Sequence, residues 1–294
     1  MLLAELIASS LRMAVPILLT AIGAVYTERA GVVNIGLEGM MIVGSFWGAL
    51  GSYYFGPYMG FLIAMTAGAV LALIHAIATV TFRVDQIVSG VALNILAYGS
   101  SRFLSQAFFK MATTTPHVNG LFKIKLPFLG DTSPIIILAL VLVPLAGFIL
   151  EKTVFGLRLR SVGENPLAAD TLGINVFKMK YAGVIISGVL AGLSGAYLAL
   201  EHTGMYVEGM TQGKGFIALA AMIFGNWNPQ GALWASLLFG FAESLSFRVV
   251  QNAIIPYQFI KMIPYVLTLA VLAGVVRKYT PPAADGVPYE RGTK

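Results

Sequence analysis

Residues 39–82 read GMMIVGSFWGALGSYYFGPYMGFLIAMTAGAVLALIHAIATVTF, which is 44 positions without an Asp, Glu, Lys or Arg. The hydrocarbon core of a bilayer is about 30 Å thick, and a helix crosses it with about 20 apolar residues. The stretch is therefore too long for one crossing and long enough for two. Gly56 and Pro57 supply a break between them. We expect two membrane-spanning helices joined by a tight turn.

The composition of the whole chain also indicates a membrane protein. Of the 294 residues, 57% are hydrophobic and 11% are charged, whereas soluble domains carry about 25% charged residues. No polar stretch is long enough for a second domain, so we expect one transmembrane domain at residues 1–280 and a cytoplasmic tail at residues 281–294. The net charge of +6 comes from basic residues between apolar stretches, which favours membrane orientation over nucleic-acid binding. The absence of cysteine excludes disulfides and thiolate metal sites.

The other apolar stretches predict further crossings. Together they indicate an all-α polytopic membrane bundle of about eight or nine spans, expected at residues 11–26, 31–55, 58–82, 86–109, 134–150, 181–200, 234–249 and 255–276. Residues 215–224 are apolar but only about half a crossing long. Such a half-length helix is tolerated at membrane depth where other protein or a watery cavity covers its ends. The sequence leaves open whether this helix crosses or turns back.

The distribution of charge predicts the orientation of the bundle. Lys and Arg are biased toward the cytoplasmic side of short loops. If residues 151–180, the longest charged segment, are cytoplasmic, most of the 19 Lys and Arg fall on that side and the N-terminus lies outside.

Small residues recur at helical spacing inside the expected spans. The pairs are Gly44 with Gly48, Gly188 with Gly192, and Ala191 with Gly195. Such pairs let helix backbones approach closely, so they predict packing within the bundle and say nothing about a cargo.

The long charged loop contains the signals of a very short helix. Asn165 suits the N-cap, Pro166 suits the first helical position, and Gly173 suits a left-handed stop. An isolated helix of this length is marginal in water, so something must hold it. It either docks into a groove on a partner protein or lies on the membrane bundle, and the helix signals alone do not separate these alternatives.

Four stretches make the chain similar to a known family. They are FGLRLRSVGENP at residues 155–166, RAGVVNIGLEG at residues 29–39, DQIVSG at residues 85–90 followed by Asn94, and GNWNPQG at residues 225–231. The chain resembles the permease subunits of bacterial ABC importers, in the nucleoside and simple-sugar branch of the ribose and branched-chain amino acid permease family. The resemblance implies an ABC importer permease fold, a multi-pass protein of the inner membrane, and import of nucleosides by alternating access.

The resemblance also implies partners. In this family the loop helix rests on a cytoplasmic ATPase, which here would contact Gly163, Glu164, Asn165, Pro166, Ala168, Ala169, Asp170 and Gly173. The chain has no GxxxxGK[ST] phosphate loop, so it is not expected to bind a cofactor, and ATP with Mg²⁺ belongs to the partner. Many relatives carry an additional N-terminal span, so we expect a heterodimer with a longer permease. An extracytoplasmic binding protein would deliver cargo at Glu201, His202 and Glu208. The favoured alternative is that these three are solvated loop residues without such a partner.

Polar side chains inside the spans are candidates for the substrate path. Glu38 lies one helical turn beyond Asn34, and either side chain could line a polar path. The favoured alternative for Glu38 is a position near the inner surface, paired with Arg29 or Arg83.

Two further side chains are path candidates, each with a structural alternative. Asn94 could bond a sugar hydroxyl or base edge, or a neighbouring helix. Trp47 could offer a stacking face, although aromatic side chains in spans usually serve packing. His75 is expected to make an interhelical bond.

Other function classes fit the sequence less well. Ribose-like sugars or branched-chain amino acids are alternative cargoes of the same kind of importer. An ion-coupled secondary transporter needs intramembrane acids or bases, and only Glu38, Arg102, Glu243 and Lys261 qualify. A membrane enzyme is disfavoured because the three histidines are far apart in sequence and no nucleophile motif is present.

Overall fold

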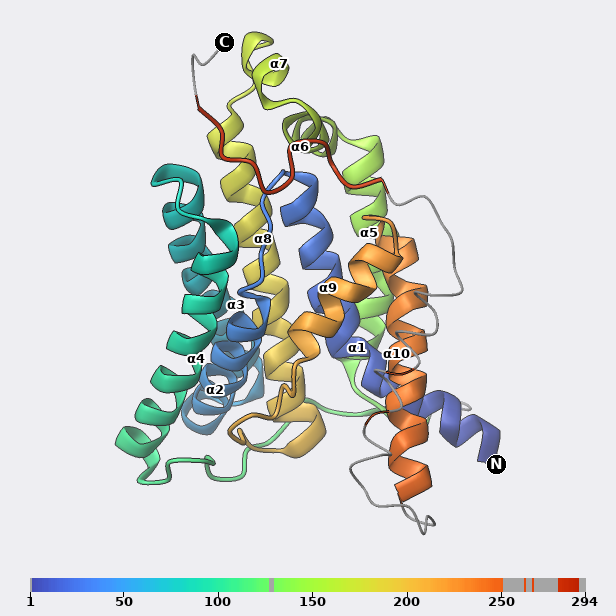
Figure 1. The fold of residues 1–294 in the computed structure, drawn as a ribbon. Coiled ribbons are helices and arrows are strands. Elements are labelled where there is room, and N and C mark those ends of the chain that lie inside the picture. The colour runs from blue at the N-terminus through green and yellow to red at the C-terminus, as the bar shows by residue number, and fades with distance from the viewer. Residues whose placement is uncertain (1, 127–129, 251–261, 263–265, 267–279, 291–294) are drawn as a thin grey trace.

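The computed structural model describes residues 2–126, 130–250, 262, 266 and 280–290. Within them the helices run back and forth between two ends of the molecule (Figure 1). The elements in chain order are α1 (Leu2–Arg29), α2 (Leu37–Phe55), α3 (Pro57–Ala76), the π-helical turn η1 (Ile77–Thr81), α4 (Gln86–Phe109), β1 (Ile124–Leu126), β2 (Gly130–Thr132), α5 (Pro134–Lys152), α6 (Val154–Glu164), α7 (Pro166–Thr171), α8 (Val176–Ala196), the π-helical turn η2 (Tyr197–Thr203), α9 (Lys214–Phe224) and α10 (Pro229–Val250). The expected helical fold is confirmed for these residues, apart from the short antiparallel pair β1 and β2.

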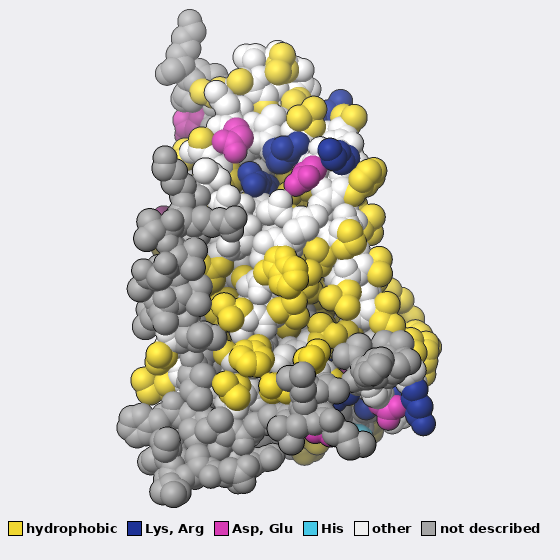
Figure 2. Space-filling model, turned by 90° about the vertical axis from the view of Figure 1, so that its right-hand side faces the viewer, with side chains coloured by type: hydrophobic (Ala, Val, Ile, Leu, Met, Phe, Trp, Pro, Cys, Tyr) yellow, Lys and Arg dark blue, Asp and Glu magenta, His cyan; other side chains and the backbone are white. Residues whose placement is uncertain are grey.

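Five helical segments of the described chain are long and apolar enough to cross a membrane. They are Glu5–Arg29, Pro57–Thr81, Gln86–Phe109, Pro134–Lys152 and Val176–Thr203. Figure 2 shows hydrophobic side chains over the middle of one face, with charged side chains toward the end that carries α6 and α7 and a further group toward the opposite end. The chain is therefore a multi-pass membrane protein. The span expected at residues 255–276 lies outside the described residues.

The expected span at residues 31–55 is wrong in its first part. α1 ends at Arg29, residues 30–36 are not helical, and α2 begins only at Leu37. This nonhelical stretch, the α1–α2 break, begins at the end that carries α6 and leads into the interior of the bundle (Figure 1).

Side chains from α3 and α4 hold the α1–α2 break. Gln86 Oε1 accepts a 2.6 Å hydrogen bond from the Val33 amide, and the Val33 carbonyl is 3.1 Å from His75 Nε2. Asn94 Nδ2 donates to the Ile35 carbonyl at 3.1 Å. Irregular backbone persists at membrane depth only where such partners replace helical hydrogen bonds. The long-range partners therefore explain why an apolar sequence is not helical here.

The half-length helix expected at residues 215–224 is confirmed as α9, which has 11 residues. It runs obliquely from the middle of the bundle toward the end that carries α6, and α10 then leads back (Figure 1). α9 follows a nonhelical segment, as α2 does, so two helices of this bundle begin in its interior.

Glycines allow α2 and α8 to pack backbone against backbone. A Cβ atom at Gly44 would lie 2.5 Å from Gly192 Cα, and one at Gly195 would lie 2.0 Å from the Met41 carbonyl oxygen. Neither position has room for a side chain unless the helices move apart. The close approach predicted from the small-residue pairs is therefore confirmed at these glycines.

Candidate functional site

The short helix predicted in the charged loop is α7. Asn165 is its N-cap, and its Oδ1 accepts a 3.0 Å hydrogen bond from the Ala168 amide. Pro166 occupies the first turn, and Gly173 has a φ of +79° just after the helix. α7 stands at the far end of the molecule, beyond the ends of α5 and α8 (Figure 1). Its position makes it available to a protein outside the membrane.

The predicted contact residues of this loop divide into buried and exposed groups. Ala169 is buried, and a Cβ atom at Gly163 would lie 2.2 Å from the Arg29 carbonyl oxygen. These two residues therefore attach the loop to the bundle. Glu164 lies 4.0 Å from Arg29, in an ion pair with a partly exposed carboxylate. Asn165 and Ala168 are exposed.

Two leucines complete the exposed surface of α7. Leu167 is 46% exposed and Leu172 is 80% exposed. Exposing large apolar side chains to water at the tip of a polar loop costs free energy, and a partner that covers them removes this cost. We did not predict them as contact residues, although the signal was present as leucines at spacing i, i+5 beside the capping residues.

Glu38 binds the beginning of α9. Its carboxylate is 2% exposed and accepts hydrogen bonds from Thr211 Oγ1 at 2.6 Å, the Gly213 amide at 2.9 Å and the Gly215 amide at 2.7 Å. The first amides of a helix lack partners within the helix and attract negative charge. Glu38 therefore joins the start of α2 to the start of α9 inside the bundle.

The favoured prediction for Glu38 is wrong. Arg29 instead contacts Glu164 and the Trp227 carbonyl, and Arg83 pairs with Glu290 at 2.7 Å. Asn34 also lies in the α1–α2 break and not on the helix that carries Glu38. The prediction failed because it assumed one continuous helix through both residues.

Asn94 performs the interhelical role that was one of its two predicted alternatives. Its Oδ1 accepts from the Gly39 amide at 2.7 Å, in the first turn of α2, while its Nδ2 donates to the Ile35 carbonyl. Both ends of the amide are thus engaged with backbone. Asn34 is fully buried and donates to Ser187 Oγ at 2.9 Å, and its Oδ1 has no hydrogen-bond partner.

His75 makes the interhelical bonds predicted for it. Its Nδ1 lies 3.0 Å from Ser89 Oγ on α4, and its Nε2 contacts the Val33 carbonyl. The histidine is completely buried, so it serves the packing of α3, α4 and the α1–α2 break.

Trp47 faces a cavity of about 430 Å³ between α2, α3 and α4. Thr66 and Ser100 add hydroxyl groups to a lining that is otherwise apolar. Trp47 is therefore the path candidate that combines an aromatic face with accessible space among the described residues.

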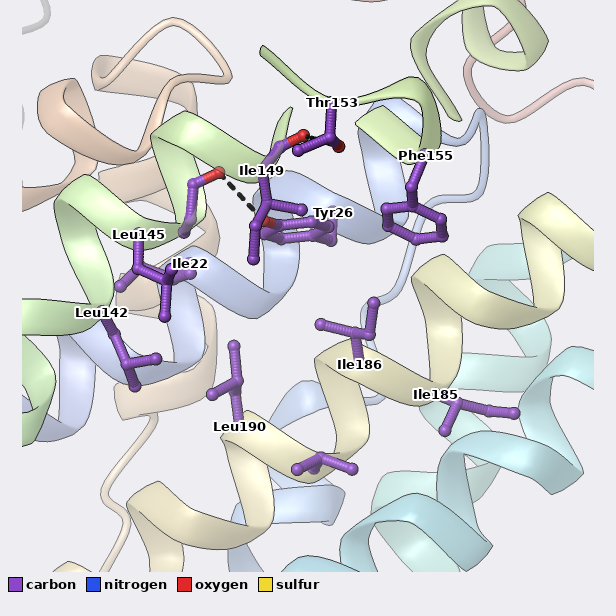
Figure 3. Close-up of a pocket in the computed structure, with 12 residues that line it drawn as sticks. Ile22, Tyr26, Leu142, Leu145, Ile149, Thr153, Phe155, Ile185, Ile186 and Leu190 are labelled. Carbon is purple, nitrogen blue, oxygen red and sulfur yellow. Dashed lines mark hydrogen bonds between the residues drawn. The ribbon is translucent and has the colours of Figure 1, made fainter. Parts of the chain in front are cut away.

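A larger cavity of about 640 Å³ lies between α1, α5 and α8. Figure 3 shows its lining of leucine and isoleucine side chains, with Tyr26 donating its hydroxyl hydrogen bond to the Ala146 carbonyl at 2.9 Å. This lining has little to offer the hydroxyl groups of a polar cargo.

The three residues predicted to meet a binding protein do not form one cluster of free charges. Glu201 accepts from the Leu121 amide at 2.6 Å, which fixes the loop after α4. Glu208 pairs with Arg102 at 3.4 Å, and both side chains remain partly exposed. His202 lies in η2 beside the Lys214–Glu243 ion pair. Of the three, His202 is the exposed residue, whereas Glu201 and Glu208 are only partly exposed.

The charged residues at membrane depth have structural partners. Lys214 at the start of α9 pairs with Glu243 of α10 at 2.7 Å, and both side chains are mostly buried. Lys261 lies outside the described residues. Because Glu38 and the Lys214–Glu243 pair are occupied in holding α9, they give little support to an ion-coupling role.

Known proteins resemble the chain over nearly its whole length. Residues 6–272 match the family described as branched-chain amino acid transport system / permease component. The guanosine ABC transporter permease protein NupQ of Bacillus subtilis (strain 168) is 45% identical over 99% of this chain and 98% of NupQ. The nucleoside ABC transporter permease protein NupC of Lactococcus lactis subsp. cremoris (strain MG1363) is 44% identical over 97% of this chain and 96% of NupC. The guanosine ABC transporter permease protein NupP of Bacillus subtilis (strain 168) is 25% identical over 93% of this chain and 82% of NupP.

Proposed function

We propose that this chain, which belongs to the family of branched-chain amino acid transport system permease components, is the membrane subunit of an ATP-driven importer for nucleosides. Relatives at 44% and 45% identity, each matched over nearly its full length, are named as nucleoside and guanosine permeases. The proposal that transport is driven by ATP rests on α7, a short capped helix that presents Leu167 and Leu172 at one end of the membrane bundle.

The proposed importer contains a second permease and an ATPase. The chain matches both NupQ and NupP of one organism, and it covers 98% of NupQ but only 82% of NupP. This difference supports a heterodimer in which the partner permease is the longer chain. ATP and Mg²⁺ bind to the cytoplasmic ATPase, and an extracytoplasmic binding protein brings the nucleoside to the opposite end.

The same proposal includes a topology. The chain has about eight or nine spans in the bacterial inner membrane, with the N-terminus outside and α7 in the cytoplasm. In this topology α9 and the segment before it together make one crossing. Support comes from Figure 1, where the N-terminus and residues 280–290 lie at opposite ends of the bundle.

Uptake by the purified complex in proteoliposomes tests the cargo. We expect accumulation of labelled guanosine or adenosine only when ATP is supplied on the side of the ATPase. Unlabelled nucleosides should compete, whereas ribose and leucine should not. Competition by ribose or leucine alone would reassign the cargo, and uptake without ATP that an ionophore abolishes would overturn the ATP-driven mechanism in favour of an ion-coupled transporter.

Charge on the exposed surface of α7 should release the ATPase. The double substitution Leu167→Asp and Leu172→Asp removes apolar burial of about 1.5–3 kcal/mol per side chain, so affinity should fall at least about 100-fold. Retention of the ATPase on the immobilised permease measures this. Phe122→Asp, at a residue 61% exposed in the loop after α4, is the matched control. Equal retention by both variants would contradict docking through α7.

Tryptophan substitutions at Gly163 and Asn165 test ATPase coupling less directly than the leucine substitutions do. Gly163→Trp would force a side chain against the Arg29 carbonyl, so it tests packing of α6 on α1. Asn165→Trp removes a cap that contributes about 1 kcal/mol and adds bulk at an exposed position, so it still probes coupling.

A further inference from the structure

Residues 280–290, here called the C-terminal strap, lie along the same end of the bundle as α6 and α7 (Figure 1). The Ala284 amide donates to the Gly163 carbonyl at 2.9 Å, and the Ala283 amide donates to Glu164 Oε2 at 3.3 Å. Both acceptors belong to the last residues of α6, directly before the cap of α7. The strap is therefore attached to the base of the loop helix.

Other contacts connect the strap to turns that are distant in sequence. The Thr280 amide donates to Asn226 Oδ1 at 3.0 Å in the turn between α9 and α10. Glu290 pairs with Arg83 at 2.7 Å in the turn between α3 and α4. One segment of 11 residues thus bridges the loop helix to both turns.

A buried lysine joins the strap to the α1–α2 break. Lys180 of α8 is 2% exposed, and its Nζ donates to the Gly31 carbonyl at 3.0 Å and to the Val287 carbonyl at 3.3 Å. An ammonium group buried between two backbone carbonyls fixes both segments relative to α8. The strap therefore reaches the segment that leads to Glu38.

Tyr289 gives the strap its hydrophobic anchor. It is 6% exposed and forms a small core, separate from the main one, with Val162, Ala169 and Val176. Its ring lies 5.6 Å from that of Phe177 in an edge-on arrangement. Ala169 is the buried residue of α7, so this core is what holds α7 to the bundle.

We propose that the C-terminal strap is a positioning element that holds α7 rigidly against the bundle, so that motion of the ATPase reaches the interrupted helices α2 and α9. An α7 without the strap would keep its exposed leucines and still bind the ATPase. It would also tilt independently of the bundle, and ATP would be hydrolysed without transport. Tyr289 is the positioning residue on which this depends.

A substitution at Asp285 should strengthen docking of the strap, whereas Tyr289→Ala should weaken it. It lies beside Glu28 of α1, with Lys180 as the neighbouring cation. Burial raises the pKa of Asp285 from 3.8 to about 6, while bonding to Glu28 and the Gly286 amide and the charge of Lys180 lower it. Because the docked strap binds the proton more tightly, docking is strongest below pH 4 and weakens as the pH rises to about 6. Asp285→Asn removes this cost at neutral pH.

The test compares three variants of the assembled complex. Tyr289→Ala should lower the equilibrium constant for strap docking by about 100-fold or more. Asp285→Asn should raise this constant at pH 7, because the amide carries no charge to bury. Val287→Ala, at a residue that is 54% exposed, should leave it unchanged. Hydrogen exchange of residues 280–290 measures docking. Nucleoside uptake per ATP hydrolysed should fall several-fold in Tyr289→Ala and stay at least at the wild-type level in Asp285→Asn, with ATPase binding retained in both.

A second readout separates failure of this inference from failure of the proposed function, on which it rests. The chain has no cysteine, so spin labels can be placed at Thr171→Cys on α7 and Ile95→Cys on α4, at positions that are exposed and outside the leucine pair proposed to bind the ATPase. Tyr289→Ala should broaden the distance distribution between the labels whatever the cargo is. An unchanged distribution, or an unchanged ratio of uptake to ATP hydrolysis, would overturn the positioning role. Absence of ATP-driven uptake in the wild type with a broadened distribution would instead overturn the proposed function.

Discussion

Glu38→Ala is expected to abolish uptake and to reduce the folded yield of the chain. The substitution leaves the Thr211 hydroxyl and the Gly213 and Gly215 amides without their acceptor inside the bundle. Each unpaired buried group costs about 1–3 kcal/mol, and α9 also loses the negative charge at its N-terminus. The total is a large part of the stability of a typical protein. Size-exclusion profiles of the solubilised chain and thermal unfolding midpoints measure the effect.

Two control variants test whether the effect of Glu38→Ala comes from the lost contact with α9. Glu38→Gln keeps the size of the side chain and one acceptor oxygen, so it should have an intermediate effect. Glu151→Ala removes an exposed carboxylate that bonds Asn228 at the surface, and it should change stability by less than about 1 kcal/mol. Wild-type stability in Glu38→Gln together with a changed KM for nucleosides would return Glu38 to the substrate path. Wild-type uptake and stability in Glu38→Ala would show that α9 does not need this contact.

The Glu38 contact has a mechanistic meaning because it belongs to a continuous series of bonds. Asn94 of α4 holds the first turn of α2 through the Gly39 amide, and Glu38 in that turn holds the start of α9. Two helices that begin inside the bundle are thereby tied to each other and to α4. Alternating access requires elements that move together between two arrangements. This series makes α2 and α9 candidates for one such unit.

Local signals explain what the sequence predicted correctly. The caps of α7 depend on Asn165, Pro166 and Gly173, which lie within nine residues and act through short-range bonds. The family predicted from residues 29–39 and 155–166 is confirmed by the match to the permease family. These motifs could be identified from the sequence because each is a short continuous stretch.

Long-range partners explain what the sequence could not predict. The α1–α2 break is stabilised by Gln86 and Asn94, which bond residues 53 and 59 positions away. Hydropathy alone cannot distinguish this apolar stretch from a helix, since the partners are invisible in it. Gly31, with a φ of +74°, was the local sign that the helix ends there. The strap had no comparable sign, because its contacts depend on where helices and turns far apart in the sequence come together.

Gly195→Val is expected to prevent folding of the membrane bundle. A Cβ atom at this position would lie 2.0 Å from the Met41 carbonyl oxygen and 2.7 Å from the Ser45 amide nitrogen, so α2 and α8 would have to separate. Overpacking a core commonly costs about 1–3 kcal/mol when side chains can adjust. Here the obstacle is backbone, and no rotamer change relieves it. We expect little folded chain in a fluorescence-detected size-exclusion profile.

Gly99→Val on α4 is the matched control, because nothing within the described structure lies within 4 Å of a Cβ atom there. Both substitutions replace a helical glycine with the same β-branched residue, so the intrinsic helix preference changes equally in both. The difference in folded yield therefore isolates the contact between α2 and α8. A graded loss from Gly195→Ala to Gly195→Val, with Gly99→Val near wild type, is expected because the first added carbon already meets the Met41 carbonyl. Similar yields for the two valine variants would mean that α2 and α8 are not packed backbone to backbone in the membrane.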